Sequence, residues 1–102
     1  MKMKPLYRQG DVLIMRVAKP VSTKFETPET PVILAHGEAT GHAHTIAGVR
    51  QLWRDGSELI LRIDAPQEVR HQEHAPIKLP PGTYRVRRQR EYTPEAIRNV
   101  AD

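Results

Sequence analysis

The chain has 102 residues, 38% of them hydrophobic and 27% charged, with nine prolines and six glycines, which predicts one globular domain over residues 1–102 and excludes a disordered tail. It contains no cysteine, which excludes disulfides, thiolate metal sites and a cysteine nucleophile, and its longest apolar run, residues 12–15, is too short to cross a membrane. The net charge of +4 permits contact with a nucleic acid or another polyanion without establishing it, and we expect a soluble, cytoplasmic protein.

The first half of the chain predicts short strands separated by turns. A strand over residues 11–18 follows Gly10, and residues 21–31, with two prolines and several threonines, predict a loop or an irregular edge connection. A strand resumes over residues 32–35, the glycines at the two ends of segment 37–41 indicate a turn, and residues 42–47 are expected to be extended.

The second half continues the pattern. Asp55-Gly56 is typical of a tight hairpin turn, and Tyr84 and Val86 are expected on the inner face of the last strand. Strands are predicted over residues 49–53, 58–63, 68–71 and 83–88. Arg88 falls on the same inner face, which predicts either a bulge or a buried guanidinium with a carboxylate partner, and Glu91 is the nearest acid in the sequence.

Thr93-Pro94 combines a helix-capping residue with a proline suited to the first helical position, so one short C-terminal helix is predicted over residues 94–100. With about seven short strands and this helix, the fold class is all-β. The economical architectures are a small β-barrel or a two-sheet sandwich. Because some strands carry apolar residues on both faces, we also expect a homodimer that completes the core.

All five histidines lie between residues 36 and 74, in two clusters. The first cluster holds His36, His42 and His44, and the second holds His71 and His74. His42 and His44 are two apart in a predicted strand, so their rings project from the same face. The other two would face opposite sides of a strand, and a turn between them would bring their rings together.

Imidazole nitrogens suit divalent metals, and two clusters within one small fold can meet in space. We therefore predict one divalent ion, Zn, Fe, Mn or Ni, held by His42, His44, His71 and His74, with His36 as a candidate helper. Two alternatives stay open at this point. The histidines can form a metal-free cluster for acid/base chemistry or phosphate binding, or they can be unrelated surface residues.

Two glutamates, Glu38 and Glu73, stand beside the histidines and are the candidate catalytic residues. An isolated glutamate in a loop usually faces solvent, so the same two residues are equally compatible with a surface role.

His42-Ala43-His44, followed later by Pro80-Pro81-Gly82, resembles parts of the two cupin motifs. In those motifs a glycine precedes a His-x-His pair, and a later Pro-x-Gly precedes another histidine. The resemblance implies a small β-barrel with a histidine-lined mouth. Gly48 or Val49 stands here in place of the cupin glutamate and Arg85 in place of the later histidine, so a cupin-like site would need ligands from residues 71–74.

The chain as a whole is similar to a family of small bacterial and phage-borne proteins without an assigned activity. The segments that carry the similarity are residues 7–12 (YRQGDV), 41–44 (GHAH), 71–74 (HQEH) and 88–92 (RQREY). The similarity brings no function with it, and it implies that the histidine pairs and residues 89–92 form one constellation. Glu91 and Tyr92, with Arg90, are then expected behind the metal-binding rings, because a metal-bound imidazole usually donates its other N–H to a carboxylate or carbonyl.

Two classes of function follow. In the first, the protein is a small metal-dependent enzyme that acts on an anionic small molecule. The anion-binding candidates are Arg85, Arg88 and Arg90. In the second, it is a nucleic-acid-binding module, with phosphates on these arginines and Arg87 and with bases stacked on exposed aromatic rings. A solvated strand face explains the run of arginines equally well.

Overall fold

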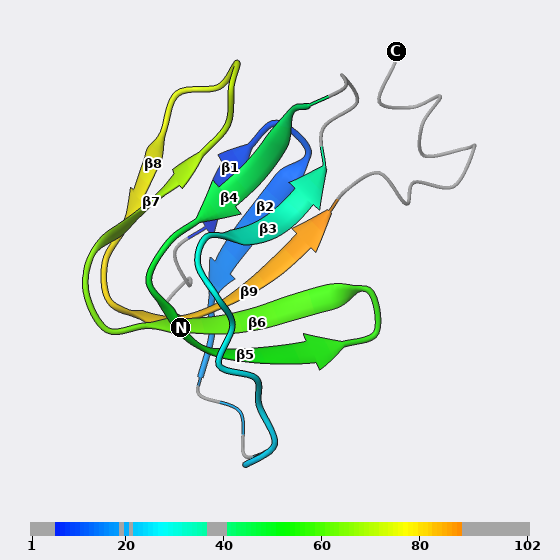
Figure 1. Ribbon diagram of the computed structural model, residues 1–102, viewed down its shortest axis with the longest axis vertical. Helices are drawn as coiled ribbons and strands as arrows, with labels where there is room; N and C mark the ends of the chain where they lie inside the picture. Colours follow the sequence, from blue (N-terminus) through cyan, green and yellow to red (C-terminus); the bar gives the residue numbers. More distant parts are fainter. Residues whose placement is uncertain (1–5, 19, 21, 37–40, 89–102) are drawn as a thin grey trace.

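A computed structural model describes residues 6–18, 20, 22–36 and 41–88 of the chain. Within these residues the chain forms strands and turns, and the strands pair in two antiparallel sheets (Figure 1). The strands are β1 (Leu6–Gln9), β2 (Val12–Arg16), β3 (Val32–His36), β4 (Ala43–Ile46), β5 (Val49–Asp55), β6 (Glu58–Ile63), β7 (Gln67–Arg70), β8 (Ile77–Leu79) and β9 (Gly82–Arg88).

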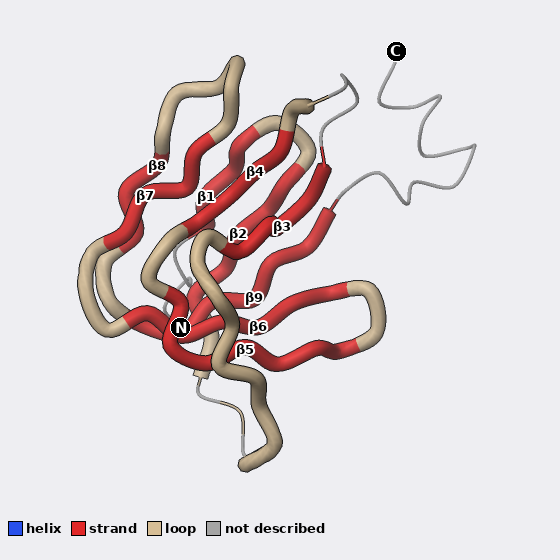
Figure 2. The backbone as a smooth tube through the Cα atoms, in the orientation of Figure 1, coloured by secondary structure: helices blue, strands red, loops and turns tan. Residues whose placement is uncertain are grey.

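One sheet has the strand order β1-β2-β9-β6-β5, and the other has the order β3-β4-β7-β8. Hairpins make most of the pairings, and the pairing of β2 with β9 joins the two ends of the described chain. Residues 22–31 connect the two sheets and reach β5, where Glu26 and Leu52 exchange backbone hydrogen bonds. The smooth trace in Figure 2 shows how short most of the loops between strands are.

The core lies between the sheets, because both contribute side chains to one cluster of buried apolar residues. The period-2 alternation of β9 turns Tyr84 and Val86 inward, where they are 0% and 4% exposed. The opposite sheet supplies Val32, Ile46, Val69 and Leu79 to the same cluster. Ile60, on the second face of β6, is also buried, as its apolar character on that face predicts.

The all-β prediction is confirmed. Closure into a barrel is not observed among the described strands, because each sheet ends in two free edge strands, β1 and β5 in one and β3 and β8 in the other. The cupin-like barrel is therefore not supported. The helix predicted over residues 94–100 lies outside the described residues, and the described part holds no helix. It accordingly offers no helix long and apolar enough to span a membrane.

Arg88 points inward as the strand period predicts, and the structure supplies a carboxylate partner that the sequence did not indicate. Its Nε donates a hydrogen bond of 2.9 Å to Oδ2 of Asp11. The two residues meet because β2 and β9 are antiparallel, with Val12 opposite Arg88. The predicted partner, Glu91, lies outside the described residues.

Tyr84 contributes both a buried ring and a hydrogen-bonded hydroxyl to the core, and these two contributions can be tested separately. The ring is fully buried, and the hydroxyl donates a 2.6 Å hydrogen bond to the carbonyl of Pro80. We expect Tyr84→Phe to lower the free energy of unfolding by about 1 kcal/mol, and Tyr84→Ala by about 3 to 5 kcal/mol, because the latter also empties core volume. Urea denaturation measures both, and equal losses in the two variants would contradict this division.

Candidate functional site

Four of the five histidines meet at one end of the two-sheet structure. There the turn between β1 and β2, the start of β4 and the β7–β8 loop come together (Figure 1). The pairing of β4 with β7 sets Thr45 opposite Arg70, which brings the residues preceding β4 beside those following β7. The ring centroids of His42 and His71 are 5.5 Å apart, those of His44 and His71 4.3 Å, those of His44 and His74 5.9 Å, and those of His71 and His74 4.7 Å.

Two of these separations, 4.7 and 5.5 Å, fall in the range of imidazoles that share an ion, and the other two, 4.3 and 5.9 Å, lie within 0.4 Å of it. With metal–nitrogen bonds of roughly 2 Å, two rings on one ion have centres about 4.5 to 5.5 Å apart at the usual bond angles. The turn that the sequence analysis placed between His71 and His74 brings their rings together, and both rings also lie near His44. The two clusters therefore meet in space.

His44 is the buried member of the group, 2% exposed, and a buried glutamine fixes its proton. The side-chain nitrogen of Gln9 donates to the carbonyls of Val69 and Ala75, at 3.0 and 2.9 Å. A flipped amide would set its oxygen against both carbonyls, so Oε1 must face Nδ1 of His44, 2.9 Å away. An oxygen only accepts, so Nδ1 carries the proton and Nε2 of the neutral ring keeps its lone pair.

That lone pair faces charged and titratable groups. Nε2 of His44 lies 3.8 Å from Oδ1 of Asp11, whose other oxygen is bound by Arg88. Burial, followed by the neighbouring His71, lowers the pKa of His44 from 6.5 to about 4, against the opposing influence of Asp11. Burial acts to raise the pKa of Asp11, but the hydrogen bond and charge of Arg88 prevail, and that pKa is lowered. At neutral pH the site therefore holds a neutral imidazole beside a carboxylate.

His71 has the opposite tautomer. Its Nδ1 accepts a hydrogen bond of 3.0 Å from the backbone N–H of Glu73, so the proton of the neutral ring is on Nε2. Burial and the adjacent His74 and His42 lower its pKa. The carboxylate of Glu73 lies 3.7 Å from Nδ1 of His42. The loop that carries these residues is fixed to β4, because the side-chain oxygen of Gln72 accepts from the N–H of Ala43 at 2.9 Å.

As the side chains stand, no three His, Asp or Glu donors of the described residues surround one point in the manner of a metal site. The tautomer of His71 accounts for part of this. Its lone pair, on Nδ1, already accepts the backbone N–H of Glu73 and so does not face the other rings as a ligand. His74 is exposed and His42 and His71 are partly exposed, so their rings can turn, whereas burial and the bond to Gln9 fix His44.

Gly10 lets the β1–β2 turn approach these rings. It has a φ of +60°, and a Cβ at this position would stand 2.9 Å from Nε2 of His74 and 3.4 Å from Cε1 of His44. The left-handed backbone disfavours a side chain here, and a Cβ would also displace the ring of His74. The turn therefore forms one wall of the histidine site.

The remaining predicted site residues fall elsewhere. His36 ends β3 and lines a different cavity together with Arg88, and no ring contact within the described part of the chain joins it to the four clustered histidines. Arg85 binds Asp55 and Glu58, and Arg87 binds Glu58, so both candidate anion contacts on the outer face of β9 already have carboxylate partners. Glu38, Arg90, Glu91 and Tyr92 lie outside the described residues.

Sequence reasoning missed Gln9 and Asp11, two residues that contact His44. Both flank Gly10 in the segment YRQGDV, which the sequence analysis used only as a mark of family similarity. The available signal was that a glycine in a predicted turn has a polar residue on each side of it. Gln9 ends β1, and Asp11 directly precedes β2. What the sequence did not reveal is that the hydrogen-bond partners of these two side chains, His44 for Gln9 and Arg88 for Asp11, lie 35 and 77 residues away.

The sequence profile of a family described as a domain of unknown function (DUF8820) matches residues 8–89. The matched range includes all five histidines, Gln9, Asp11 and Arg88. No curated protein and no solved structure matches the chain.

The lowered pKa of His44 predicts acid sensitivity. Because the folded value of about 4 lies below the ordinary 6.5, the unfolded chain binds an extra proton between these two pH values, and stability falls as the pH drops through that window. The full effect is of the order of 3 kcal/mol. Urea titrations at stepped pH in the presence of a chelator measure it. We expect His44→Gln to flatten the curve and His36→Gln to leave it unchanged, and a curve unaffected by His44→Gln would contradict the assignment.

Gly10 and Gly56 form a matched pair for testing the wall of the site. Both are turn glycines with φ near +60°, but a Cβ on Gly56 would meet nothing within 4 Å. We expect Gly10→Ala and Gly56→Ala to destabilise the fold by similar amounts, of the order of 1 kcal/mol each, from backbone strain. Only Gly10→Ala should shift the ring resonances of His74 and His44 in NMR spectra. Unshifted rings in Gly10→Ala would show that the turn does not confine them.

Proposed function

The chain belongs to the DUF8820 family, which assigns it no activity, and from the site itself we propose that the protein binds one divalent metal ion, Zn, Fe, Mn or Ni, at the four clustered histidines. The observation that carries the proposal is the state of His44: a buried, neutral imidazole whose Nδ1–H is held by Gln9 and whose Nε2 lone pair faces Asp11. Metal-binding histidines characteristically have their second nitrogen fixed in this way.

The spacing around this nitrogen suits an ion. Donor atoms bonded to the same ion stand about 3 to 3.5 Å apart, and Nε2 of His44 and Oδ1 of Asp11 are 3.8 Å apart. A movement of these two atoms toward each other by a few tenths of an ångström would therefore let both bind one ion. Arg88 holds the other oxygen of Asp11, so the carboxylate is already turned toward the ring.

The other rings are close enough to be recruited. Ordering an exposed side chain costs about 0.5 to 1.5 kcal/mol, and zinc bound in zinc-finger peptides, which include thiolate ligands, contributes about 10 kcal/mol or more. Turning His74, and freeing His71 from the N–H of Glu73, are small costs on that scale. The ion would thus complete a site that the fold has partly assembled.

A bound ion with an open position polarises a carbonyl or phosphoryl oxygen, or lowers the pKa of bound water. The proposal therefore extends to a metal-dependent enzyme that acts on an anionic small molecule. Glu73, beside His42, is the described carboxylate best placed to move a proton there.

The metal-free alternative has one observation in its favour. His44 offers a lone pair at Nε2 and His71 a proton at Nε2, with ring centroids 4.3 Å apart, which is the pairing required for proton transfer between two imidazoles. The nucleic-acid alternative has less support, because Arg85 and Arg87 are engaged by Glu58 and Asp55. Metal content distinguishes the proposed metal site from the metal-free proton-transfer cluster.

We expect untagged protein, purified without chelator or nickel resin, to contain about one divalent ion per chain. Saturating the protein at a hundred times the dissociation constant should raise the free energy of unfolding by about 2.7 kcal/mol, and a chelator should reverse this. Elemental analysis, calorimetric titration and thermal unfolding measure these quantities.

Two variants locate the ion. His74→Gln alters an exposed ring and should weaken binding without loss of fold, whereas His36→Gln, its control, should bind normally. Protein that takes up none of Zn, Mn, Fe or Ni, or equal binding by both variants, would refute the metal site and leave the proton-transfer cluster.

A further inference from the structure

We infer that the cavity beside Arg88, at the end of β3 and β9, binds a small carboxylate with a short apolar body. The cavity measures about 260 Å³. Its lining residues are Val12, Leu34, Ala35, His36, Ser57, Leu59, Val86 and Arg88. The inference deepens the proposed function by naming the chemical class of its anion. Any reaction of that anion rests on the proposed function, whereas its binding in the cavity does not.

The cavity combines an apolar floor with one cation. Val12 and Val86 belong to the buried core, and Leu34, Ala35 and Leu59 pack against it. Arg88 is the one arginine or lysine among the lining residues, and its side chain is only 21% exposed. A guanidinium in such surroundings is less screened by water than a surface arginine, so an anion gains more from meeting it.

Arg88 retains donors for a ligand. Its hydrogen bond to Asp11 uses Nε, and a guanidinium has five N–H donors in a planar fork. Within the described residues, no hydrogen bond or ion pair of its two terminal nitrogens occurs. A carboxylate matches two N–H groups of that fork, and the Ser57 hydroxyl and His36 ring supply further polar contacts along the lining.

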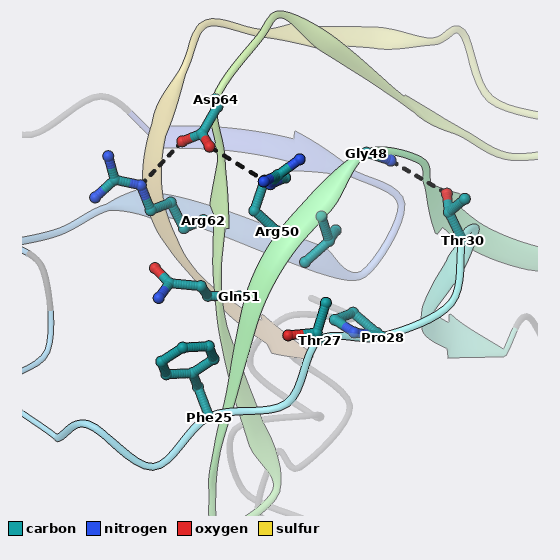
Figure 3. A pocket seen from close by; sticks show the side chains of 10 residues that line it. Phe25, Thr27, Pro28, Thr30, Gly48, Arg50, Gln51, Arg62 and Asp64 are labelled. Atoms are coloured by element: carbon teal, nitrogen blue, oxygen red, sulfur yellow. Dashed lines mark hydrogen bonds and ion pairs between the residues drawn. The ribbon is translucent and has the colours of Figure 1, made fainter.

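The largest described cavity is a weaker candidate for an anion. It measures about 710 Å³ and is lined by residues 25–30 and by β5 and β6. Figure 3 shows Arg50 and Arg62 both directed at Asp64, with nitrogen–oxygen distances of 3.6 and 3.0 Å. The Arg50 side chain is 70% exposed, so solvent screens its charge, whereas the Arg88 side chain, which also pairs with a carboxylate, is only 21% exposed.

Size and chemistry define the ligand. Ordinary ligand pockets measure about 300 to 1,000 Å³, so this cavity suits a molecule of the order of ten non-hydrogen atoms. The terminal nitrogens of Arg88 suit one negative group, and the partly exposed side chains of Leu34, Ala35 and Leu59 suit a short hydrocarbon body beside it. Asp11 links this pocket to the histidine site, because one of its oxygens binds Arg88 and the other faces His44. A carboxylate on Arg88 would therefore lie close to the proposed ion.

The probe is benzoate, titrated into full-length protein in the presence of a chelator and followed by NMR at the amides of Ala35, Ser57 and Val86. A ligand of this size is expected to bind with a dissociation constant of the order of a millimolar. Benzamide, which has nearly the same shape without the charge, and inorganic phosphate, which has charge without an apolar body, should each bind at least tenfold more weakly. Equal binding of benzamide or phosphate would overturn the assigned ligand class.

Arg87 supplies the matched control, since it adjoins Arg88 in sequence but does not line the cavity. Arg88→Gln should weaken benzoate binding at least tenfold, and Arg87→Gln should not change it. Should Arg88→Gln fail to fold, Ala35→Leu fills the cavity with Arg88 intact and should have the same effect. Binding that survives either cavity variant, or that Arg87→Gln removes, refutes the pocket.

One further variant separates this inference from the metal proposal. His44→Gln should lose metal uptake but keep benzoate binding in chelator. Loss of both would mean that the variant has disturbed Asp11 and Arg88. The pocket is then tested in the folded, metal-free wild-type protein. Failure of that protein to bind benzoate would refute the pocket and leave the metal proposal unaffected.

Discussion

The buried amide of Gln9 is the interaction on which the rest of the site depends. A buried amide must have all its polar groups bonded, and this one reaches three other elements: β7, the β7–β8 loop and β4. Because Gln9 ends β1, in the five-stranded sheet, and its partners belong to the four-stranded sheet and its loop, one side chain joins the two sheets where the histidines meet. Replacing it with an apolar residue would leave two carbonyls and one imidazole N–H without these bonds.

The chemistry of the site follows from the direction of those bonds. Two backbone carbonyls orient the amide, the amide sets the tautomer of His44, and the tautomer leaves the Nε2 lone pair facing Asp11. The backbone of Glu73 imposes the opposite tautomer on His71. The two rings therefore differ in which nitrogen carries the proton although they are the same residue type, and in both cases backbone groups set the difference, through Gln9 for His44 and directly for His71.

Sequence reasoning reached those parts of the site that depend on local periodicity. The rings of His71 and His74 lie 4.7 Å apart, as a turn between them predicts. The period-2 rule put His42 and His44 on one face of a strand, but β4 begins at Ala43, and it is the ring of His71 that lies near both. The same rule placed Arg88 on the inner face of β9. The partners of these residues depended on long-range pairing: Asp11 lies 77 positions from Arg88, and Gln9 lies 35 from His44. A single sequence carries no local pattern for such distances, so Gln9 and Asp11 went unnoticed and Glu91 was chosen only for its proximity in the chain.

The fold shows the same division. Alternation and turn residues predicted seven of the nine described strands and missed the short strands β1 and β8. The choice between a closed barrel and two open sheets depends on which strands pair, and core packing across the described chain decides this. The arginine run illustrates the difference. As a count it is a basic patch, but strand alternation separates it: Arg85 and Arg87 project outward to Glu58, while Arg88 turns inward to Asp11. Charge on the outer face is largely cancelled, and the one arginine that faces the interior lies between an apolar cavity and the histidine site. Strand alternation therefore divides the run into two outward arginines that are paired with acids and one inward arginine, Arg88, whose Nε is bonded to Asp11.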